Sequence, residues 1–395
     1  MTGYSLSAMG VCCALGKDKM SVWESASQGD RTGMVLRADL LIDAQPVRVG
    51  QVADPLPILS EWPSELRSRN NQLALLAFEQ IRDEVEGARE RFGAGRVGVV
   101  IGTSTSGIAE GEQALRHYQQ KGSMPPDYHY SKQEMMAPAD FIARLACVTG
   151  PSYVISTACS SSARALMSAR TLLQADLVDA VIVGGVDSLC QLTLNGFKAL
   201  ESISADLCQP FSLNRDGINI GEGAALFLMT KESGDSVRLF GTGAASDAHH
   251  MSAPHPQGRG ARKAIEQACR QAELQPGDLD YINLHGTATR LNDSMESHVL
   301  NELSAMAVPA SSTKGMTGHT LGAAGAIEAA LCWLTLSDLN TGDQLLPHCW
   351  DNQPDPELAP LAFVEKGQCR PVSRCLSNSF AFGGNNLALI FGRDR

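Results

Sequence analysis

The sequence predicts an α/β protein made of two similar halves, with parallel strands placed between helices. An apolar run that ends in glycines and hydroxyl residues occurs at 96–107, and one that ends in glycines occurs at 179–187. Such runs are typical of buried strands that deliver loops to one edge of a sheet. Strand, helix and strand in that order imply a parallel sheet with right-handed crossovers. The second half repeats the order of elements, which would bring the ends of equivalent strands to one shared cleft.

Length and composition exclude several classes of protein. The chain has 395 residues, which is enough for two domains or one duplicated domain. Its net charge of −11 and its 5% aromatic content argue against nucleic-acid binding. The eleven cysteines form no Cys-x-x-Cys pair and indicate reduced thiols in the cytosol. The first ten residues lack the basic region typical of a secretory leader, and no apolar run reaches the roughly 18 residues of a membrane span, so the expected location is the cytosol.

The first 150 residues are expected to contain both regular elements and irregular segments. Residues 4–16 predict an opening strand and turn, and a helix start is expected near 21–25. Several prolines in 37–60 indicate irregular surface. The apolar spacing over 64–86 predicts one amphipathic helix. Residues 108–150, after the first buried strand, are expected to be a less regular excursion that covers a pocket or an oligomer contact.

The stretch 151–170 places a cysteine between a strand and a helix. Residues 153–155 favour a buried strand, and the helix is expected to include Cys159 among its first residues. Most solitary cysteines beside small apolar residues are inert core filling. At a helix start, however, outward-pointing N–H groups and the helix dipole make a thiol easier to ionise. This setting makes Cys159 a candidate nucleophile.

The division between the halves is expected at the polar segment 231–236, giving residues 1–232 and 233–395. In the second half, 281–289 stands where 97–105 stood in the first. The segment 308–319, with the helical run after it, stands where the Cys159 unit stood. The duplication therefore predicts that Cys159 faces His285 and His319, both from the second half.

A thiol faced by two histidines suits acyl transfer. The sulfur takes the acyl group, and the imidazoles donate hydrogen bonds to a developing oxyanion or enolate. Turns at Gly286 and at Gly383 and Gly384 would let backbone N–H groups approach the reacting carbonyl.

Four motifs in order identify a resemblance to a known family. They are Thr-Ala-Cys-Ser-Ser at 157–161, His-Gly-Thr-Ala-Thr at 285–289, Lys-Gly-Met-Thr-Gly-His at 314–319 and Asn-Ser-Phe-Ala-Phe-Gly-Gly at 378–384. Over nearly its whole length the chain resembles the elongating β-ketoacyl-acyl-carrier-protein synthases of the thiolase superfamily. The resemblance implies a thiolase-like fold of two similar halves in α-β-α-β-α layers.

The resemblance also implies a role for each catalytic residue. Cys159 would accept the acyl group from the phosphopantetheine thiol of a carrier protein. His285 and His319 would stabilise the enolate formed when malonyl-carrier protein loses carbon dioxide, and this carbanion would attack acyl-Cys159 in a Claisen condensation. Lys314 and Glu328 match the family's supporting ion pair, although a plain structural ion pair explains them equally well.

Further residues match the family's substrate contacts. The N–H groups of Cys159 and Phe382 would form the oxyanion hole, and Phe380 and Phe382 would lie at the gate to the acyl pocket. Thr287 and Thr289 would bind the pantetheine arm, unless they only close turns.

One departure from the family pattern concerns the gate. Ala381 stands between the two phenylalanines where the family usually has glycine, and Asn385 replaces a more usual threonine. A Cβ restricts the backbone of the gating loop. We therefore expect a specialised synthase, of the polyene or polyketide type, with its own range of acyl chains.

The expected partners are an acyl carrier protein and a second subunit. Carrier proteins are acidic, so docking requires a basic spot, for which Arg67, Arg69 and Lys132 are weak candidates. The second subunit would be another copy or a homologue of the chain-length-factor type. No cofactor or metal is expected, because the substrates are carried on phosphopantetheine.

Several other functions stay open. His249, His250 and His255, with Asp247 nearby, suggest a zinc hydrolase, although the intervening residues are not helical. A noncatalytic partner subunit would be expected to lack the nucleophile that this chain has. A thiolase or a coenzyme-A-using starter synthase would be expected to show a different set of active-site residues. A serine hydrolase is disfavoured because no Gly-x-Ser-x-Gly elbow is present.

Overall fold

The computed structural model describes residues 3–232 and 234–393, and within them ten strands form one mixed sheet in the order β11-β10-β12-β13-β9-β1-β8-β6-β4-β5. Five neighbouring strands come from each half of the chain, and the two groups meet where β1 pairs with β9 through Tyr4 and Ser5. The strands are β1 (Tyr4–Cys12), β4 (Val97–Gly102), β5 (Ser152–Ile155), β6 (Ala180–Asp187), β8 (Gly223–Thr230), β9 (Arg238–Ser246), β10 (Tyr281–Asn283), β11 (Ala310–Ser311), β12 (Arg374–Ala381) and β13 (Asn385–Gly392).

The outer strands of each half are parallel, as the sequence predicts. In the first half β4 pairs in parallel with β5 and β6, and in the second half β10 pairs in parallel with β11 and β12. The strands between them are antiparallel. Strands at corresponding places in the two halves of the chain thus occupy corresponding places in the sheet. Residue 233 lies outside the described residues, and the division at this residue stays a prediction.

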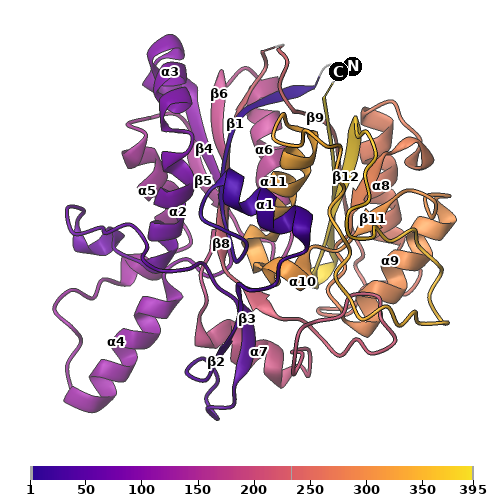
Figure 1. Cartoon of the computed structure of the whole chain (residues 1–395). Coiled ribbons are helices and arrows are strands. Elements are labelled where there is room, and N and C mark those ends of the chain that lie inside the picture. The colour runs from indigo at the N-terminus through magenta and orange to yellow at the C-terminus, as the bar shows by residue number, and fades with distance from the viewer. Residues whose placement is uncertain (1–2, 233, 394–395) are drawn as a thin grey trace.

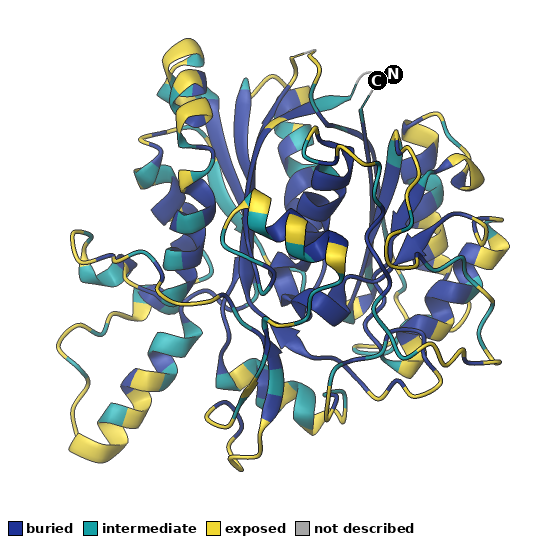
Figure 2. Ribbon diagram, viewed as in Figure 1, coloured by how far each residue is buried: buried dark blue, intermediate teal, exposed yellow. Residues whose placement is uncertain are grey.

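Helices cover both groups of strands and separate them, so that the molecule has five layers (Figure 1). The first outer layer contains α2 (Arg69–Glu79), α3 (Arg82–Phe92) and α5 (Ala137–Leu145), the middle layer α1 (Lys19–Gln28), α6 (Ser161–Gln174) and α11 (Ala324–Leu336), and the second outer layer α8 (Arg259–Gln271) and α9 (Arg290–Glu302). Figure 2 shows most strands of the main sheet and α11 almost entirely buried. The predicted α-β-α-β-α arrangement is confirmed.

A small second sheet lies at the end of the molecule where the parallel strands terminate (Figure 1). Its strands are β2 (Met34–Arg37), β3 (Val47–Gly50) and β7 (Ile220–Gly221), and nearby helices are α4 (Ile108–Lys121), α7 (Gln191–Ala199) and α10 (Lys314–Thr317). Glycine is required at 221, because a Cβ there would lie 2.3 Å from the carbonyl oxygen of Thr317. This sheet therefore packs directly against the loop that follows α10.

Short 3₁₀ segments complete the fold. They are η1 (Ser64–Leu66), η2 (Ala94–Arg96), η3 (Tyr130–Gln133), η4 (Pro276–Asp278), η5 (Leu321–Ala323) and η6 (Phe382–Gly384).

The structure corrects the predicted elements of the first half. Residues 64–86 form η1, α2 and the start of α3 instead of one helix, and the break lies beside Gln80, whose side-chain amide donates to the Val11 carbonyl of β1 at 2.9 Å. The region 37–60 contains β3, and 108–150 contains α4 and α5. The first helix begins at Lys19, because the Asp18 carboxylate caps it. Bonds to distant elements decide these boundaries.

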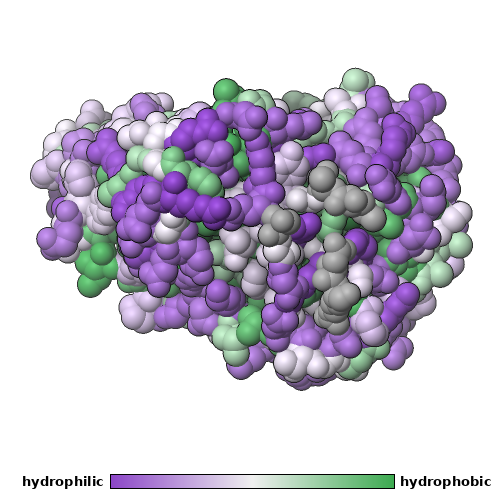
Figure 3. Space-filling view, turned by 90° about the horizontal axis from the view of Figure 1, so that it is seen from above, coloured by the Kyte–Doolittle hydropathy of each residue, from purple (hydrophilic) through white to green (hydrophobic). Residues whose placement is uncertain are grey.

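The face that carries both ends of the described chain is mostly hydrophilic, with scattered apolar side chains (Figure 3). Over the same residues, no helix has both the length and the apolar character needed to cross a bilayer.

Candidate active site

Cys159 lies in a tight turn between β5 and α6. The prediction that it lies inside the helix is wrong, because α6 begins at Ser161. Ala158 takes a left-handed φ of 53°, and the hydroxyl groups of Ser160 and Ser161 donate to the carbonyls of Thr157 and Ala158. The turn places the Cys159 sulfur in the wall of a cavity. The residue as a whole is only 6% exposed.

His319 lies beside the sulfur, with its Nε2 atom 2.9 Å from the Cys159 Sγ atom. Its backbone N–H donates to the Asn219 carbonyl at 2.7 Å, and its carbonyl accepts from the Gly221 N–H at 2.9 Å. The small sheet therefore holds this histidine on both sides.

His285 reaches the same place from the loop after β10. Its ring centroid lies 5.5 Å from that of His319, with the two rings nearly perpendicular. The Lys314 Nζ atom lies 3.4 Å from His285 Nδ1. An ammonium group has only donors, so Nδ1 must accept and the ring hydrogen is on Nε2. The neutral ring of His285 thus offers a hydrogen-bond donor. The structure brings together Cys159, His285 and His319, as the duplication predicts.

Lys314 and Glu328 form a buried ion pair, with side chains 2% and 4% exposed. Burial raises the pKa of Glu328 to about 7, although contact with Lys314 acts to lower it. Burial, together with the Lys314 charge, holds the pKa of both His285 and His319 well below the ordinary value. Both imidazoles are therefore neutral near pH 7.

The thiol of Cys159 is harder to ionise than the helix start suggests. Burial raises its pKa to about 11, against the lowering effects of the Lys314 charge and of the Phe382 and Cys159 N–H groups. Burial therefore outweighs the expected ease of ionisation. In the resting protein the neutral sulfur can give its proton to Nε2 of His319.

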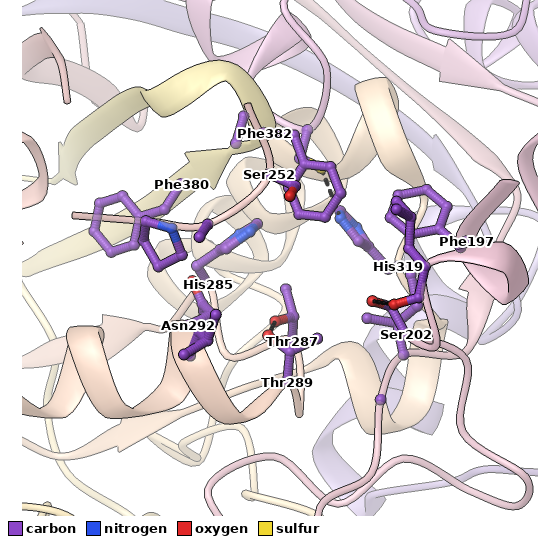
Figure 4. Close-up of a pocket in the computed structure, with 18 of the residues that line it drawn as sticks. Phe197, Ser202, Ser252, His285, Thr287, Thr289, Asn292, His319, Phe380 and Phe382 are labelled. Carbon is purple, nitrogen blue, oxygen red and sulfur yellow. Dashed lines mark hydrogen bonds between the residues drawn. The ribbon is translucent and has the colours of Figure 1, made fainter. Parts of the chain in front are cut away.

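The cavity has a volume of about 380 Å³, and residues from both halves line it. In Figure 4, His285 and His319 enter it from opposite sides, with Phe382 above them and Thr287 and Thr289 below. The Phe382 ring lies 5.5 Å from that of Phe197. The Thr287 and Thr289 hydroxyls are 2.9 Å apart.

The residues around Phe382 form a bend between two strands. Phe380 packs against His285 with ring centroids 5.9 Å apart. Ala381 keeps extended backbone, whereas Gly383 and Gly384 take φ values of 80° and 73°. The Phe382 N–H is close enough to Cys159 to act on its sulfur, as an oxyanion-hole donor must.

Two of the three predicted docking cations are not available at the surface. Arg69 binds both carboxylate oxygens of the buried Glu222, at 2.6 and 2.8 Å. Lys132 is only 6% exposed. Both are withdrawn as docking residues, because their charges are paired or buried. Arg67 is exposed, donates to the carbonyls of Ser60 and Trp62, and stays a prediction.

The histidines of the metal hypothesis do not form a ligand cluster. Among residues 3–232 and 234–393, Cys159, His285 and His319 are the one metal-like group, with ligating atoms within 4.8 Å of one another. Asp247 accepts instead from the N–H groups of His255 and Gly260. At the Cys159 group, the Lys314 ammonium disfavours a cation by charge repulsion. The zinc-hydrolase hypothesis therefore has no support in the described part of the chain.

Sequence reasoning missed a buried carboxylate that holds the His285 loop. Glu296 of α9 accepts from the N–H groups of His285 and Gly286, at 2.9 and 2.8 Å, and from the Asn378 amide at 3.1 Å. The sequence feature that could have indicated it is a glutamate between Met295 and Val299, on the apolar face of a helix.

A second missed carboxylate ties together three loops near the cavity. Asp187, at the end of β6, accepts from the Thr103 hydroxyl and the Thr105 N–H, and from the Ala323 N–H before α11. A charged residue that ends an all-apolar strand was the available signal.

Comparison with known proteins agrees with this geometry. The N-terminal domain of the β-ketoacyl synthase family matches residues 66–234, and its C-terminal domain matches residues 237–342. A 3-oxoacyl-[acyl-carrier-protein] synthase 2 from Staphylococcus aureus is 29% identical over 98% of this chain and 100% of its own length.

Solved structures show the same relationship. The ketosynthase ApeO of Xenorhabdus doucetiae, solved in complex with its chain length factor ApeC, is 45% identical, with a TM-score of 0.93 over 100% of this chain and 98% of that one. A β-ketoacyl synthase from Burkholderia phymatum is 26% identical, with a TM-score of 0.86 over 100% of both chains. The chain therefore belongs to the β-ketoacyl synthase family of condensing enzymes and has its thiolase-like fold.

Proposed function

We propose that the protein lengthens an acyl chain by two carbons, using acyl and malonyl groups carried on acyl carrier proteins, and releases a 3-oxoacyl-carrier protein. The observation that carries this proposal is the Cys159 sulfur 2.9 Å from His319 Nε2, with His285 beside it at the wall of one cavity. A nucleophile in contact with a neutral base is the requirement for acyl transfer.

The first step transfers the acyl group to the enzyme. The Cys159 thiol gives its proton to His319 Nε2 as the sulfur attacks the thioester carbonyl. The N–H groups of Cys159 and Phe382 stabilise the oxyanion. The C–S bond to pantetheine then breaks, and the leaving sulfur takes the proton from His319. The products are acyl-Cys159 and a free pantetheine thiol.

The second step forms the carbon–carbon bond. The malonyl thioester oxygen accepts from Nε2 of His285, and the bond to the carboxylate breaks with loss of carbon dioxide. In the first step the neutral His319 ring carries its hydrogen on Nδ1, which has no partner among the described residues. The ring must move this hydrogen to Nε2 before it can supply a second donor to the enolate. The carbanion attacks acyl-Cys159, and the sulfur leaves as a thiolate that takes a proton from solvent.

Lys314 acts in this scheme through His285. Its ammonium group fixes the His285 tautomer that donates, and Glu328 compensates its buried charge. Lys314 and Glu328 are therefore positioning residues.

Contacts outside the reacting atoms would set the substrate. Thr287 and Thr289 line the cavity and would bind the pantetheine arm. Ala381 would limit the movement of Phe382 and so restrict the acyl chains admitted, as in a synthase for polyene or polyketide chains. We propose that no cofactor takes part and that the enzyme works in the cytosol.

We further propose that the chain is the active subunit of a heterodimer whose second subunit is of the chain-length-factor type. The support is the 45% identity to a ketosynthase solved with its chain length factor. The presence of Cys159, His285 and His319 supports the catalytic role for this chain. A homodimer is the alternative.

Intact-mass measurement after mixing with acyl-carrier proteins of different chain length tests the reaction. We expect the protein to gain the mass of one acyl group, and Cys159→Ala to gain none. Adding malonyl-carrier protein should then release the 3-oxoacyl-carrier protein. Acylation of Cys159→Ala, or no acylation of the wild type by any carrier-bound chain, would refute the proposal.

A further inference from the structure

The outer edge of β5 is bare. β5 ends the ten-stranded sheet, and all four of its residues are half-buried although they lie in a sheet of otherwise buried strands. No strand of the described residues pairs with its outer side. An unpaired edge of this kind is a template for another chain.

Helix α6 extends this bare surface. Its buried face packs on the sheet, and Arg164, Met167, Ser168, Thr171 and Gln174 lie on the opposite side. The Ser168 hydroxyl is 2.7 Å from the Tyr153 hydroxyl of β5. The outer face of α6 therefore adjoins the edge strand, and a chain that extends the sheet beyond β5 also covers α6.

Arg164 is a half-buried cation without a counterion in the described structure. Its Nε atom is buried and has no hydrogen-bond partner. Burial alone accounts for the lowered pKa of its guanidinium, with no carboxylate acting against it. Arg170, further along the same helix, also has a buried Nε atom without a partner. Unlike Arg164, it donates through another guanidinium nitrogen to the Thr242 hydroxyl and the Gln271 side chain. A desolvated guanidinium without a partner is costly, so a carboxylate from outside the chain would be stabilising.

We propose that Arg164 selects the second subunit: it pairs with a carboxylate of a homologous but non-identical chain that covers β5 and α6, and it disfavours self-association through the same face. The proposal rests on the heterodimer proposed above and names the contact that decides its composition.

A second copy of this chain cannot supply the carboxylate from the equivalent elements. A symmetric dimer uses the same surface on both subunits, so α6 and β5 of one copy would meet α6 and β5 of the other. Residues 151–175 contain no Asp or Glu. Two copies of Arg164 would instead be buried in one interface, where like charges oppose association. A homologue with an acidic residue on its equivalent helix face has no such penalty.

The same interface would complete the wall around the nucleophile. Ser156 is exposed, and Thr157 and Ala158 are half-buried, although they directly precede the buried Cys159. A subunit seated on β5 and α6 covers this turn. The choice of partner therefore bears on the reaction as well as on assembly.

Sedimentation velocity of the full chain tests the proposal. We expect Arg164→Gln to strengthen self-association about tenfold or more, because it removes a buried like-charge pair. Arg170→Gln is the matched control and should associate like the wild type. Raising the salt concentration should change self-association of the wild type little, because charges buried in an interface are screened much less than exposed ones. A strong increase would place the repulsion at exposed charges instead of at Arg164. The mixing experiment with Arg164→Glu keeps the proposal testable if Arg164→Gln folds poorly.

Mixing adds a second readout. Native mass spectrometry of the wild type mixed with Arg164→Glu should show more mixed dimers than random pairing gives. Unchanged self-association of Arg164→Gln with no excess of mixed dimers would overturn the proposal, as would a change in acylation alone. Acylation of Cys159 is measured in parallel. If association follows the expectation but Cys159 is not acylated, the proposed reaction is refuted and the proposed interface still stands.

Discussion

The two ends of the main sheet contain equivalent elements, but the chain covers only one of the two edge strands. Each end has an edge strand, a loop with a reactive side chain and a helix of the middle layer: β5, Cys159 and α6 at one end, and β11, His319 and α11 at the other. Residues 361–364 cover β11, since Ala310 and Ala362 are joined by an N–H···O bond of 2.9 Å. No described segment covers β5 in this way.

Helices α11 and α6 also differ in how completely they are buried. Nearly every residue of α11 is buried, including Glu328, whereas α6 buries one face and leaves Arg164 on the other. The half that carries the two histidines is therefore closed by its own chain. The half that carries the nucleophile is open at its edge. The imidazole side of the cavity is therefore formed by the chain itself, whereas in the proposed heterodimer the second subunit would complete the sulfur side.

The largest expected effects divide the reaction between the two ends. Cys159→Ala should lower condensation about 10³-fold or more, because no acyl-enzyme forms, while malonyl decarboxylation continues. His285→Ala should lower decarboxylation about 10²- to 10³-fold, the usual cost of one lost oxyanion donor, and should leave acylation of Cys159 largely intact. Release of carbon dioxide and the intact mass of the enzyme report the two steps separately. Equal loss of both steps in both variants would break the comparison.

The buried pair of Lys314 and Glu328 should make the stability of the histidine-bearing half sensitive to single substitutions. Lys314→Met leaves the Glu328 carboxyl buried without its cation, so that it must stay charged and unpaired or take up a proton, and we expect the free energy of unfolding to fall by about 3–5 kcal/mol. Urea denaturation measures the loss. The double change of Lys314 and Glu328 to Met should recover part of it, because no unpaired charge remains.

Arg82→Met is the matched control for the ion pair. It breaks the surface pair with Glu79 on the outer layer and should change stability little. If the double variant were as unstable as Lys314→Met, the pair itself would not be the cause.

The sequence predicts local patterns well and distant partners poorly. The strands that end at Gly102 and Asp187 follow from apolar runs, and the meeting of Cys159 with its histidines follows from the repeated order of elements. The pairing of Arg69 with Glu222 could not be predicted, because the two residues are distant in sequence. The pKa of Cys159 depends on burial from both halves, which no window of sequence contains.

Acid should destabilise the end of the main sheet at β11 before the end at β5. His348 holds the segment that covers β11: its Nδ1 accepts from Ser312 N–H at 3.1 Å, Nε2 lies 3.0 Å from the Pro210 carbonyl, and its ring stacks on Phe363 at 4.2 Å. Burial lowers its pKa to about 3. The unfolded chain therefore binds the proton first, and stability falls as the pH drops below about 6.5, by roughly 1.4 kcal/mol per pH unit for this group.

Unfolding measured between pH 7 and 5 checks this slope. His348→Gln keeps one acceptor and one donor but cannot titrate, so the slope should decrease by about one proton. Hydrogen exchange at Ala310 and Val364 should speed up in acid in the wild type more than in the variant. An unchanged slope in His348→Gln would assign the acid sensitivity to other groups.

The smallest expected effect lies at the bend that joins the two sides of the cavity. Ala381→Gly should cost up to about 1 kcal/mol, because glycine gives the unfolded chain more freedom. Since the change also frees the backbone next to Phe382, we expect acylation to become less selective among saturated short, medium and long chains. Ala388→Gly, in β13, is the control for the backbone cost and should leave selectivity unchanged. Intact-mass rates across a panel of acyl-carrier proteins measure both variants. If the wild type accepts all three chain classes equally, or if Ala381→Gly keeps the selectivity of the wild type, Ala381 does not restrict the gate.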